Sequence, residues 1–144
     1  MTCLNKTNPW RLVWTDDLSV GLPEIDAEHK HFILLINELN SAITSRMGIE
    51  EIKRRMRAII DDAVTHFAHE ERLFKEWAYP LESEHVQRHS EALQYLQKTS
   101  EGFGRSGTDY EWIEAGLKVK QTLIEHLLHE DMKYRDFCRE SGRS

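Results

Sequence analysis

Apolar residues recur at three- and four-residue spacing in four separate runs of this 144-residue sequence, and no other feature constrains the fold as strongly. Such spacing places the apolar side chains on one face of an α-helix. Prolines and glycines separate the runs. We therefore expect an arm over about 1–23, followed by helices over about 24–46, 49–78, 81–102 and 109–139.

The short connections between the predicted helices indicate how the helices are arranged. Helices joined by only a few residues are usually neighbours that run in opposite directions. The predicted fold class is therefore all-α, an up-down-up-down antiparallel four-helix bundle with an irregular N-terminal arm. A chain of 144 residues is long enough for a sizeable core, and we expect one domain over 1–144.

Charge and composition exclude several classes of partner. The net charge is −6, from 19 basic and 25 acidic residues, and the sequence has no basic run. Nucleic acid and anionic membrane surfaces are therefore not expected as partners. The sequence has neither a segment of transmembrane length nor a signal peptide. Cys3 and Cys138 lie far apart and are expected to be reduced thiols, which favours a cytoplasmic location.

The histidines carry the main functional signal. Five of the eight fall on the apolar faces of the predicted helices, together with one glutamate: His29, His66, His85, His89, His126 and Glu70. Their positions near the starts of the first and third helices and toward the ends of the second and fourth place them at one end of an antiparallel bundle. The other three, His31, His69 and His129, lie off these faces and are expected in solvent.

A metal centre is the arrangement that explains such a cluster best. Without a metal, each buried polar atom left unpaired would cost about 1–3 kcal/mol. The pairs His66/Glu70 and His85/His89 are each four residues apart, so each sets two donors on one helical face. Imidazole and carboxylate donors suit iron, manganese or zinc. Neither cysteine lies at this level of the bundle, which disfavours a structural zinc site. The donors outnumber those that one ion accepts, which favours two ions.

The ferritin-like di-iron pattern does not account for these donors. That pattern requires Glu-x-x-His on two helices. In this sequence only Glu82 and His85 match it.

Four segments resemble, in order, the ligand motifs of the hemerythrin family, specifically its stand-alone bacterial members. They are VGLPEIDAEHKHF, HFAHEE, YPLESEHVQRH and HLLHEDMKY, and together they cover nearly the whole chain. The resemblance implies two iron ions per chain, bridged by an oxo or hydroxo group, with dioxygen as a reversible ligand.

Site residues follow from the same resemblance. It implies that His85, His89 and His126 bind one iron, that His29 and His66 bind the other, and that Glu70 and Asp131 bridge the pair. The two-histidine iron would keep an open position for dioxygen. The residues expected around that position are Phe32, Phe67, Leu123, Leu127 and Thr122.

The spacing between His126 and Asp131 conflicts with a regular helix. Five residues correspond to a rotation of about 140° from one side chain to the other, so Glu130 would be the better placed carboxylate. The family motif nevertheless selects Asp131. We therefore predict a π-type bulge in the fourth helix, which brings a five-residue spacing onto one face.

Two positions depart from the family pattern. Thr122 stands where many members have tryptophan, and Glu28 stands where many have glutamine. The smaller Thr122 predicts a more open or wetter dioxygen pocket.

The predicted function is reversible dioxygen binding for transport, storage or supply, without enzymatic turnover. A di-iron enzyme acting on peroxide or nitric oxide is the main alternative. An oxygen or iron sensor is a third hypothesis, disfavoured because no signalling domain is expected in 144 residues. The sequence does not identify a protein partner.

Overall fold

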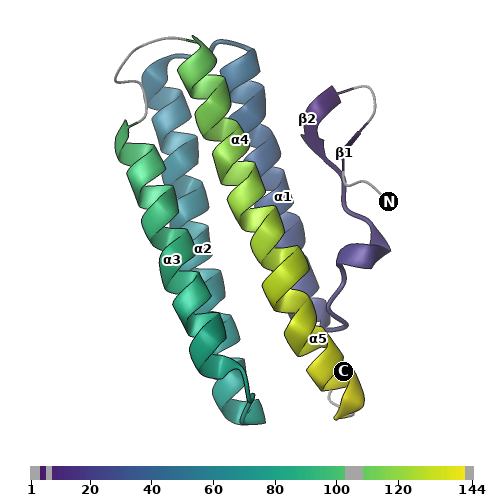
Figure 1. Ribbon diagram of the computed structural model, residues 1–144. Helices are drawn as coiled ribbons and strands as arrows, with labels where there is room; N and C mark the ends of the chain where they lie inside the picture. Colours follow the sequence, from purple (N-terminus) through teal and green to yellow (C-terminus); the bar gives the residue numbers. More distant parts are fainter. Residues whose placement is uncertain (1–3, 6–7, 103–108, 142–144) are drawn as a thin grey trace.

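A computed structural model describes residues 4–5, 8–102 and 109–141 of the chain (Figure 1). Four long helices dominate this described part, and they pack side by side as a bundle. The helices are α1 (Pro23–Thr44), α2 (Ile49–Trp77), α3 (Glu82–Gly102) and α4 (Asp109–His126). The bundle continues through a π-helical turn, η2 (Leu127–Asp131), into α5 (Met132–Glu140).

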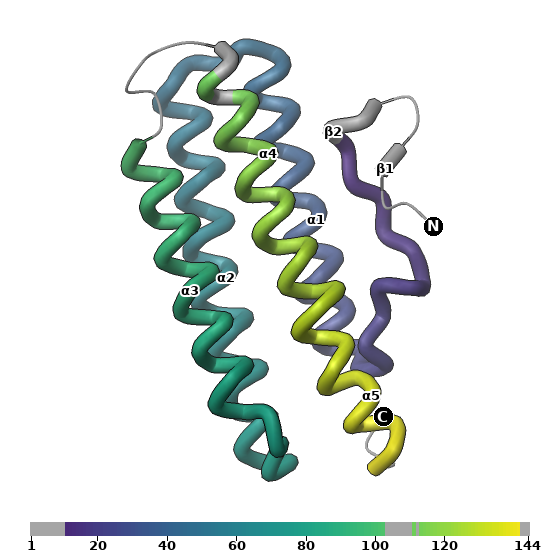
Figure 2. Tube along the Cα trace, viewed as in Figure 1, coloured from purple at the N-terminus to yellow at the C-terminus, as the bar shows by residue number. Residues whose placement is uncertain are grey.

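Each long helix contacts two others, in the cyclic order α1, α2, α3, α4 (Figure 2). Consecutive helices run in opposite directions, so the predicted antiparallel four-helix bundle is confirmed. None of the helices in the described residues is both long enough and apolar enough to cross a membrane.

The turn between α2 and α3 shows how the sequence ends one helix and reverses the chain. Ala78 adopts a left-handed conformation, with φ of 51°, and its amide donates to the carbonyl of Lys75. The amide of Tyr79 donates to the carbonyl of Phe74 at 2.9 Å. Pro80 follows and has no amide hydrogen with which to continue α2. The start of α3 is therefore brought beside the end of α2.

Two apolar clusters occupy different lengths of the bundle. The larger contains most of the inward residues of the four helices, among them Ile36, Ile59, Leu96 and Val119. The smaller one, which we call the end cluster, consists of Val20, Ile25, Phe74, Tyr79 and Tyr134. Along the chain, the histidines of interest lie between residues of these two clusters.

The N-terminal arm is more regular than the sequence predicts. Strands β1 (Leu4–Asn5) and β2 (Asn8–Leu12) pair as an antiparallel hairpin, and a 3₁₀ turn, η1 (Asp16–Leu18), follows. The amide side chain of Asn37 exchanges two hydrogen bonds with the backbone of Leu12, at 2.7 and 2.9 Å. Leu12 and Leu18 are buried, so this contact pins the arm against α1. The predicted arm therefore contains a short hairpin and a 3₁₀ turn, and an amide on α1 holds it through Leu12.

The π-helical turn lies where the sequence predicts a bulge. Residues Leu127–Asp131 adopt π-helical geometry between the regular turns of α4 and α5. Asp131 is 1% exposed, whereas Glu130 is outside both donor groups and its carboxylate accepts a hydrogen bond from Lys133 at 3.3 Å. The predicted π-type bulge is confirmed.

Of the two predicted thiols, Cys138 is buried in α5 and Cys3 lies outside the described residues.

Candidate metal centre

The structure brings all seven predicted metal ligands together inside the bundle. They come from every long helix and from the π turn, and each is at most 8% exposed. The seven are His29 on α1, His66 and Glu70 on α2, His85 and His89 on α3, His126 at the end of α4 and Asp131 in η2.

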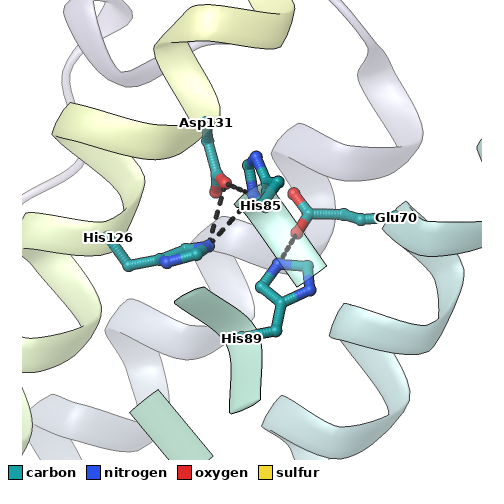
Figure 3. A group of neighbouring side chains, drawn as sticks. All are labelled: Glu70, His85, His89, His126 and Asp131. Atoms are coloured by element: carbon teal, nitrogen blue, oxygen red, sulfur yellow. Dashed lines mark hydrogen bonds and ion pairs between the residues drawn. The ribbon is translucent and has the colours of Figure 1, made fainter. Parts of the chain in front are cut away.

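Three histidines and both carboxylates form the first donor group (Figure 3). One donor atom from each of Glu70, His85, His89, His126 and Asp131 lies within 4.8 Å of the others. Oδ1 of Asp131 is 3.0 Å from Nε2 of His85 and 3.2 Å from Nε2 of His126. Oε1 of Glu70 is 3.0 Å from Nε2 of His89. Five donors at this spacing are sufficient to hold one metal ion.

The second donor group shares the same two carboxylates. It consists of His29, His66, Glu70 and Asp131, again with donor atoms within 4.8 Å of one another. Nε2 of His29 is 3.1 Å from Oδ2 of Asp131, and Nε2 of His66 is 3.4 Å from Oε2 of Glu70. Each carboxylate thus presents one oxygen to each group, which is the arrangement required of a bridging ligand.

Outer carboxylates define which nitrogen of two histidines faces inward. Nδ1 of His66 lies 2.5 Å from Oε1 of Glu28, and Nδ1 of His89 lies 2.8 Å from Oε2 of Glu71. A carboxylate can only accept, so both Nδ1 atoms carry the hydrogen. In the neutral rings, Nε2 of His66 and His89 therefore directs a lone pair toward the carboxylate oxygens of Glu70.

These contacts show that the cluster fits a metal. An imidazole nitrogen and a carboxylate oxygen that lie 3.0–3.4 Å apart need either a proton or a metal cation between them. Oδ1 of Asp131 and Nδ1 of His29 are buried and make no directed hydrogen bond to any described residue. The residues present are thus suited to hold positive charge at the centre of the cluster.

The electrostatic environment leads to the same conclusion. Burial lowers the pKa of His66, but the charge of Glu70 and the hydrogen bond to Glu28 outweigh it and raise the pKa to about 10. Burial raises the pKa of Glu70, but the charge of His66 and hydrogen bonds from nearby histidines hold it well below its usual range. The charge of His126 and the contacts of Asp131 with His126 and His29 lower the pKa of Asp131, against burial and the charge of Glu70. Both central carboxylates are therefore anionic and attract cations.

Tyr134 is a part of the site that the motif analysis did not single out. Its hydroxyl donates a 2.5 Å hydrogen bond to Oε2 of Glu70, and its ring is fully buried in the end cluster. Burial and the charge of Glu70 raise the pKa of Tyr134 well above its ordinary value, so the hydroxyl keeps its proton. The tyrosine is the last letter of the fourth quoted motif, but that motif did not indicate a role for it.

Two of the three histidines expected in solvent are exposed. His129 lies on the surface, and His31 pairs at the surface with Asp62, with Nδ1 and Oδ1 3.2 Å apart. The expectation for His69 is wrong. Its side chain is only 20% exposed, and its Nδ1 lies 2.7 Å from Oε2 of Glu28. His69 leaves the apolar stripe of α2 but turns toward the partner carboxylate of His66.

A small cavity adjoins the second donor group. It has about 20 Å³ available to the centre of a water-sized sphere. Four of the five predicted dioxygen-pocket residues line it, namely Phe32, Phe67, Leu123 and Leu127. Ile33, Ile36 and Ile124 complete the apolar wall, and the remaining lining residues are His29, His66, His126 and Asp131.

Thr122 does not line this cavity, so its predicted place is corrected. It borders a separate outer groove of about 530 Å³ between α3 and α4, which also reaches His126. The hydroxyl of Thr122 donates to the carbonyl of Lys118 at 2.7 Å, within the same helix. The neighbouring Leu123, rather than Thr122, points inward at this level of α4.

Comparison with known proteins places this geometry in a family. Residues 20–138 match the family described as the hemerythrin HHE cation binding domain. The chain is 31% identical over 127 residues to a bacteriohemerythrin of Stenotrophomonas maltophilia, covering 87% of this chain and 80% of that protein. It is 30% identical over 132 residues to a bacteriohemerythrin of Pseudomonas aeruginosa, covering 90% and 83%.

A eukaryotic relative is similar over a comparable length. The chain is 27% identical over 129 residues to a hemerythrin-like protein of Naegleria gruberi, covering 90% of this chain and 95% of that protein. The match to residues 20–138 includes all seven candidate ligands. On this evidence, the chain belongs to the hemerythrin family of cation-binding domains.

Proposed function

We propose that this protein binds dioxygen reversibly at a pair of iron ions and serves as an oxygen carrier, store or supplier. In this proposal His85, His89 and His126 hold one ion, and His29 and His66 hold the other. Glu70 and Asp131 bridge the two ions. The two overlapping donor groups and their shared carboxylates support this division.

The observation that carries the proposal is the small apolar cavity beside His29 and His66. Its volume, about 20 Å³ for the centre of a water-sized sphere, is just above the roughly 10–15 Å³ that one water molecule needs. A diatomic molecule is of comparable size. Three histidines line the cavity, and two of them, His29 and His66, belong to the donor group with fewer protein donors, so a small ligand there would lie beside that ion.

The polarity of the cavity favours an apolar ligand. Among the described residues that line it, the polar side chains are those of four candidate ligands, and the other side chains are aromatic or aliphatic. Peroxide would have to exchange its hydrogen bonds with water for this apolar wall, whereas dioxygen loses little on entering. The cavity therefore supports dioxygen binding over peroxide turnover. Nitric oxide is also a small diatomic molecule, and its turnover is retained as the alternative function.

The residues of this chain provide binding, charge balance and exclusion of water. When bound, two ferrous ions supply the electrons that dioxygen binding requires. Glu70 and Asp131 offset part of the charge of those ions, and Tyr134 fixes one oxygen of Glu70. Phe32 and Phe67 pack against His66, with ring centroids 5.1 and 5.8 Å from its own, and keep water from the cavity.

Anaerobic loading followed by exposure to oxygen tests this proposal. Iron-loaded protein should contain two iron ions per chain. Its visible spectrum should change on mixing with oxygenated buffer and return when the solution is purged with argon. A content of one iron, a preference for zinc, or a spectrum that never returns would each contradict the proposal. Consumption of nitric oxide by the reduced protein, without reversible oxygenation, would support the alternative enzyme.

A further inference from the structure

Glu28 makes two hydrogen bonds that engage both of its carboxylate oxygens. Oε1 accepts from Nδ1 of His66 at 2.5 Å, and Oε2 accepts from Nδ1 of His69 at 2.7 Å. The other ring nitrogen of His69 lies 3.8 Å from the exposed carboxylate of Glu24. The Glu28 side chain, although 33% exposed, is therefore held from two sides, and its position relative to His66 is fixed.

Glu71 plays the equivalent part on the next pair of helices. Its Oε2 accepts from Nδ1 of His89 at 2.8 Å, and its side chain is also 33% exposed. Each of these outer carboxylates directly adjoins a candidate ligand in sequence, Glu28 before His29 and Glu71 after Glu70. Each then reaches a candidate ligand on the neighbouring helix, from α1 to α2 and from α2 to α3.

We propose that Glu28, held by His69, and Glu71 are positioning residues, each of which orients one histidine ligand for a different metal ion. This inference rests on the proposed two-ion site. Glu28 orients His66 for the two-histidine ion, and Glu71 orients His89 for the three-histidine ion. The hydrogen bond at Nδ1 fixes the ring rotation and leaves the Nε2 lone pair pointing at the site.

The choice of carboxylate follows from the donors that surround it. A carboxylate accepts both the His66 and His69 hydrogens, whereas an amide has one oxygen and would present its own N–H hydrogens to the second ring. An anionic acceptor also makes the imidazole a stronger donor to a metal. His69 therefore acts through Glu28, as the residue that keeps its second oxygen engaged.

Competition with an iron chelator tests whether each carboxylate serves a different ion. Iron-loaded protein is titrated with a ferrous chelator under anaerobic conditions, and the two equivalents of iron are followed separately. Loss of an outer-shell partner commonly weakens metal binding by about 10–100-fold. Glu28→Ala should weaken one equivalent by this amount, and Glu71→Ala should weaken the other. Asp62→Ala is the matched control, because Asp62 accepts from the surface residue His31.

A conservative variant and a double variant distinguish orientation of the histidine ligand from a general effect on folding. Glu28→Gln retains one acceptor for His66 and should recover most of the affinity that Glu28→Ala loses. His69→Ala should weaken the same iron equivalent as Glu28→Ala. It should add little further loss in the Glu28→Ala background, because its effect passes through that carboxylate.

A spectroscopic measurement keeps the inference testable if one variant loads poorly. In zinc-loaded protein labelled with ¹⁵N-histidine, the Nδ1–H signals of His66 and His89 should show strong hydrogen bonding. Glu28→Gln should shift only the His66 signal. Equal weakening of both equivalents by either alanine variant, or unchanged Nδ1–H signals, would overturn the inference. The iron content of the unmodified protein tests the two-ion proposal separately, because that proposal requires two ions per chain whatever the variants show.

Discussion

The hydroxyl of Tyr134 is 2.5 Å from Oε2 of Glu70, and both residues are fully buried. The hydrogen bond joins α5 to α2 across the bundle. It also gives one oxygen of a buried anion a partner that belongs to the protein and is present whether or not metal is bound.

Replacing Tyr134 with phenylalanine should therefore destabilise the metal-free protein most. Removing one donor to a buried carboxylate costs about 1–3 kcal/mol. We expect that loss in the free energy of unfolding measured by urea denaturation of metal-free protein, and a smaller loss in iron-loaded protein, where metal can satisfy Glu70. Tyr95→Phe, at an exposed tyrosine, serves as the control. Equal losses in both forms would mean that Oε2 of Glu70 does not face the metal.

Removal of iron should lower the melting temperature and loosen one end of the bundle first. Ligands from all four long helices meet at this end, so metal binding contributes directly to their association. Hydrogen exchange in metal-free protein should increase around Glu70, His85 and Asp131, and less around Ile59 in the larger apolar cluster. Identical melting of the two forms would show that metal does not join the helices.

Single histidine replacements should separate ligands from neighbours. His66→Ala and His89→Ala should each lose iron, whereas His31→Ala and His129→Ala should retain both ions, because their side chains lie on the surface. Metal analysis of each purified variant provides the measurement. If His129→Ala loses as much iron as His126→Ala, the orientation of the last helix is wrong.

The π turn makes a specific prediction about two adjacent carboxylates. Asp131→Ala should abolish or strongly weaken iron binding, since Asp131 faces both donor groups. Glu130→Ala should leave the iron content unchanged, because its carboxylate pairs with Lys133 outside the cluster. The reverse result would show that regular α-helical winding places Glu130 at the metal.

Residues of the cavity and of the outer groove should differ in their effect on the rate at which the oxygenated protein oxidises irreversibly. Leu123→Ala enlarges the cavity beside the polar atoms of the candidate ligands, which gives water both space and hydrogen-bond partners, so the oxygenated protein should oxidise irreversibly more quickly. Thr122→Trp fills the outer groove instead and should change this rate little. Stopped-flow decay of the oxygenated spectrum measures both rates. A large slowing by Thr122→Trp would mean that the groove is the route by which water reaches the site.

The fold and the inward-facing histidines could be predicted because the three- and four-residue spacing of apolar residues indicates which face of a helix is buried. Ile36, Ile59, Leu96 and Val119 share that face with the histidines, and all are buried. The π turn could also be predicted, because the family motif implies Asp131 as a ligand and only an added residue brings Asp131 onto the face of His126.

Contacts between helices could not be predicted in the same way. The helical repeat of apolar residues does not determine how far one helix is shifted along its neighbour, or how it is rotated about its own axis. The hydrogen bonds of Glu28 with His66 and His69, and of Tyr134 with Glu70, depend on both. Thr122 was misplaced for a related reason: analogy with a larger side chain in relatives does not show where a shorter one points. The contact of the arm with α1 depends on Asn37, which no local pattern connects with Leu12.

The end cluster has a consequence for kinetics. Its aromatic residues, Phe74, Tyr79 and Tyr134, lie beyond the donors, and the larger cluster fills the bundle on the other side. A gas molecule that approaches along the bundle axis thus meets packed rings, and it enters only when side chains fluctuate apart. How fast ligand arrives is then governed by the looseness of this packing, while how tightly it is held is governed by the donors. Under the proposed function, substitutions of Phe74 or Tyr79 in the end cluster should therefore change the rate of ligand entry more than the affinity, whereas Tyr134 also bonds the candidate ligand Glu70.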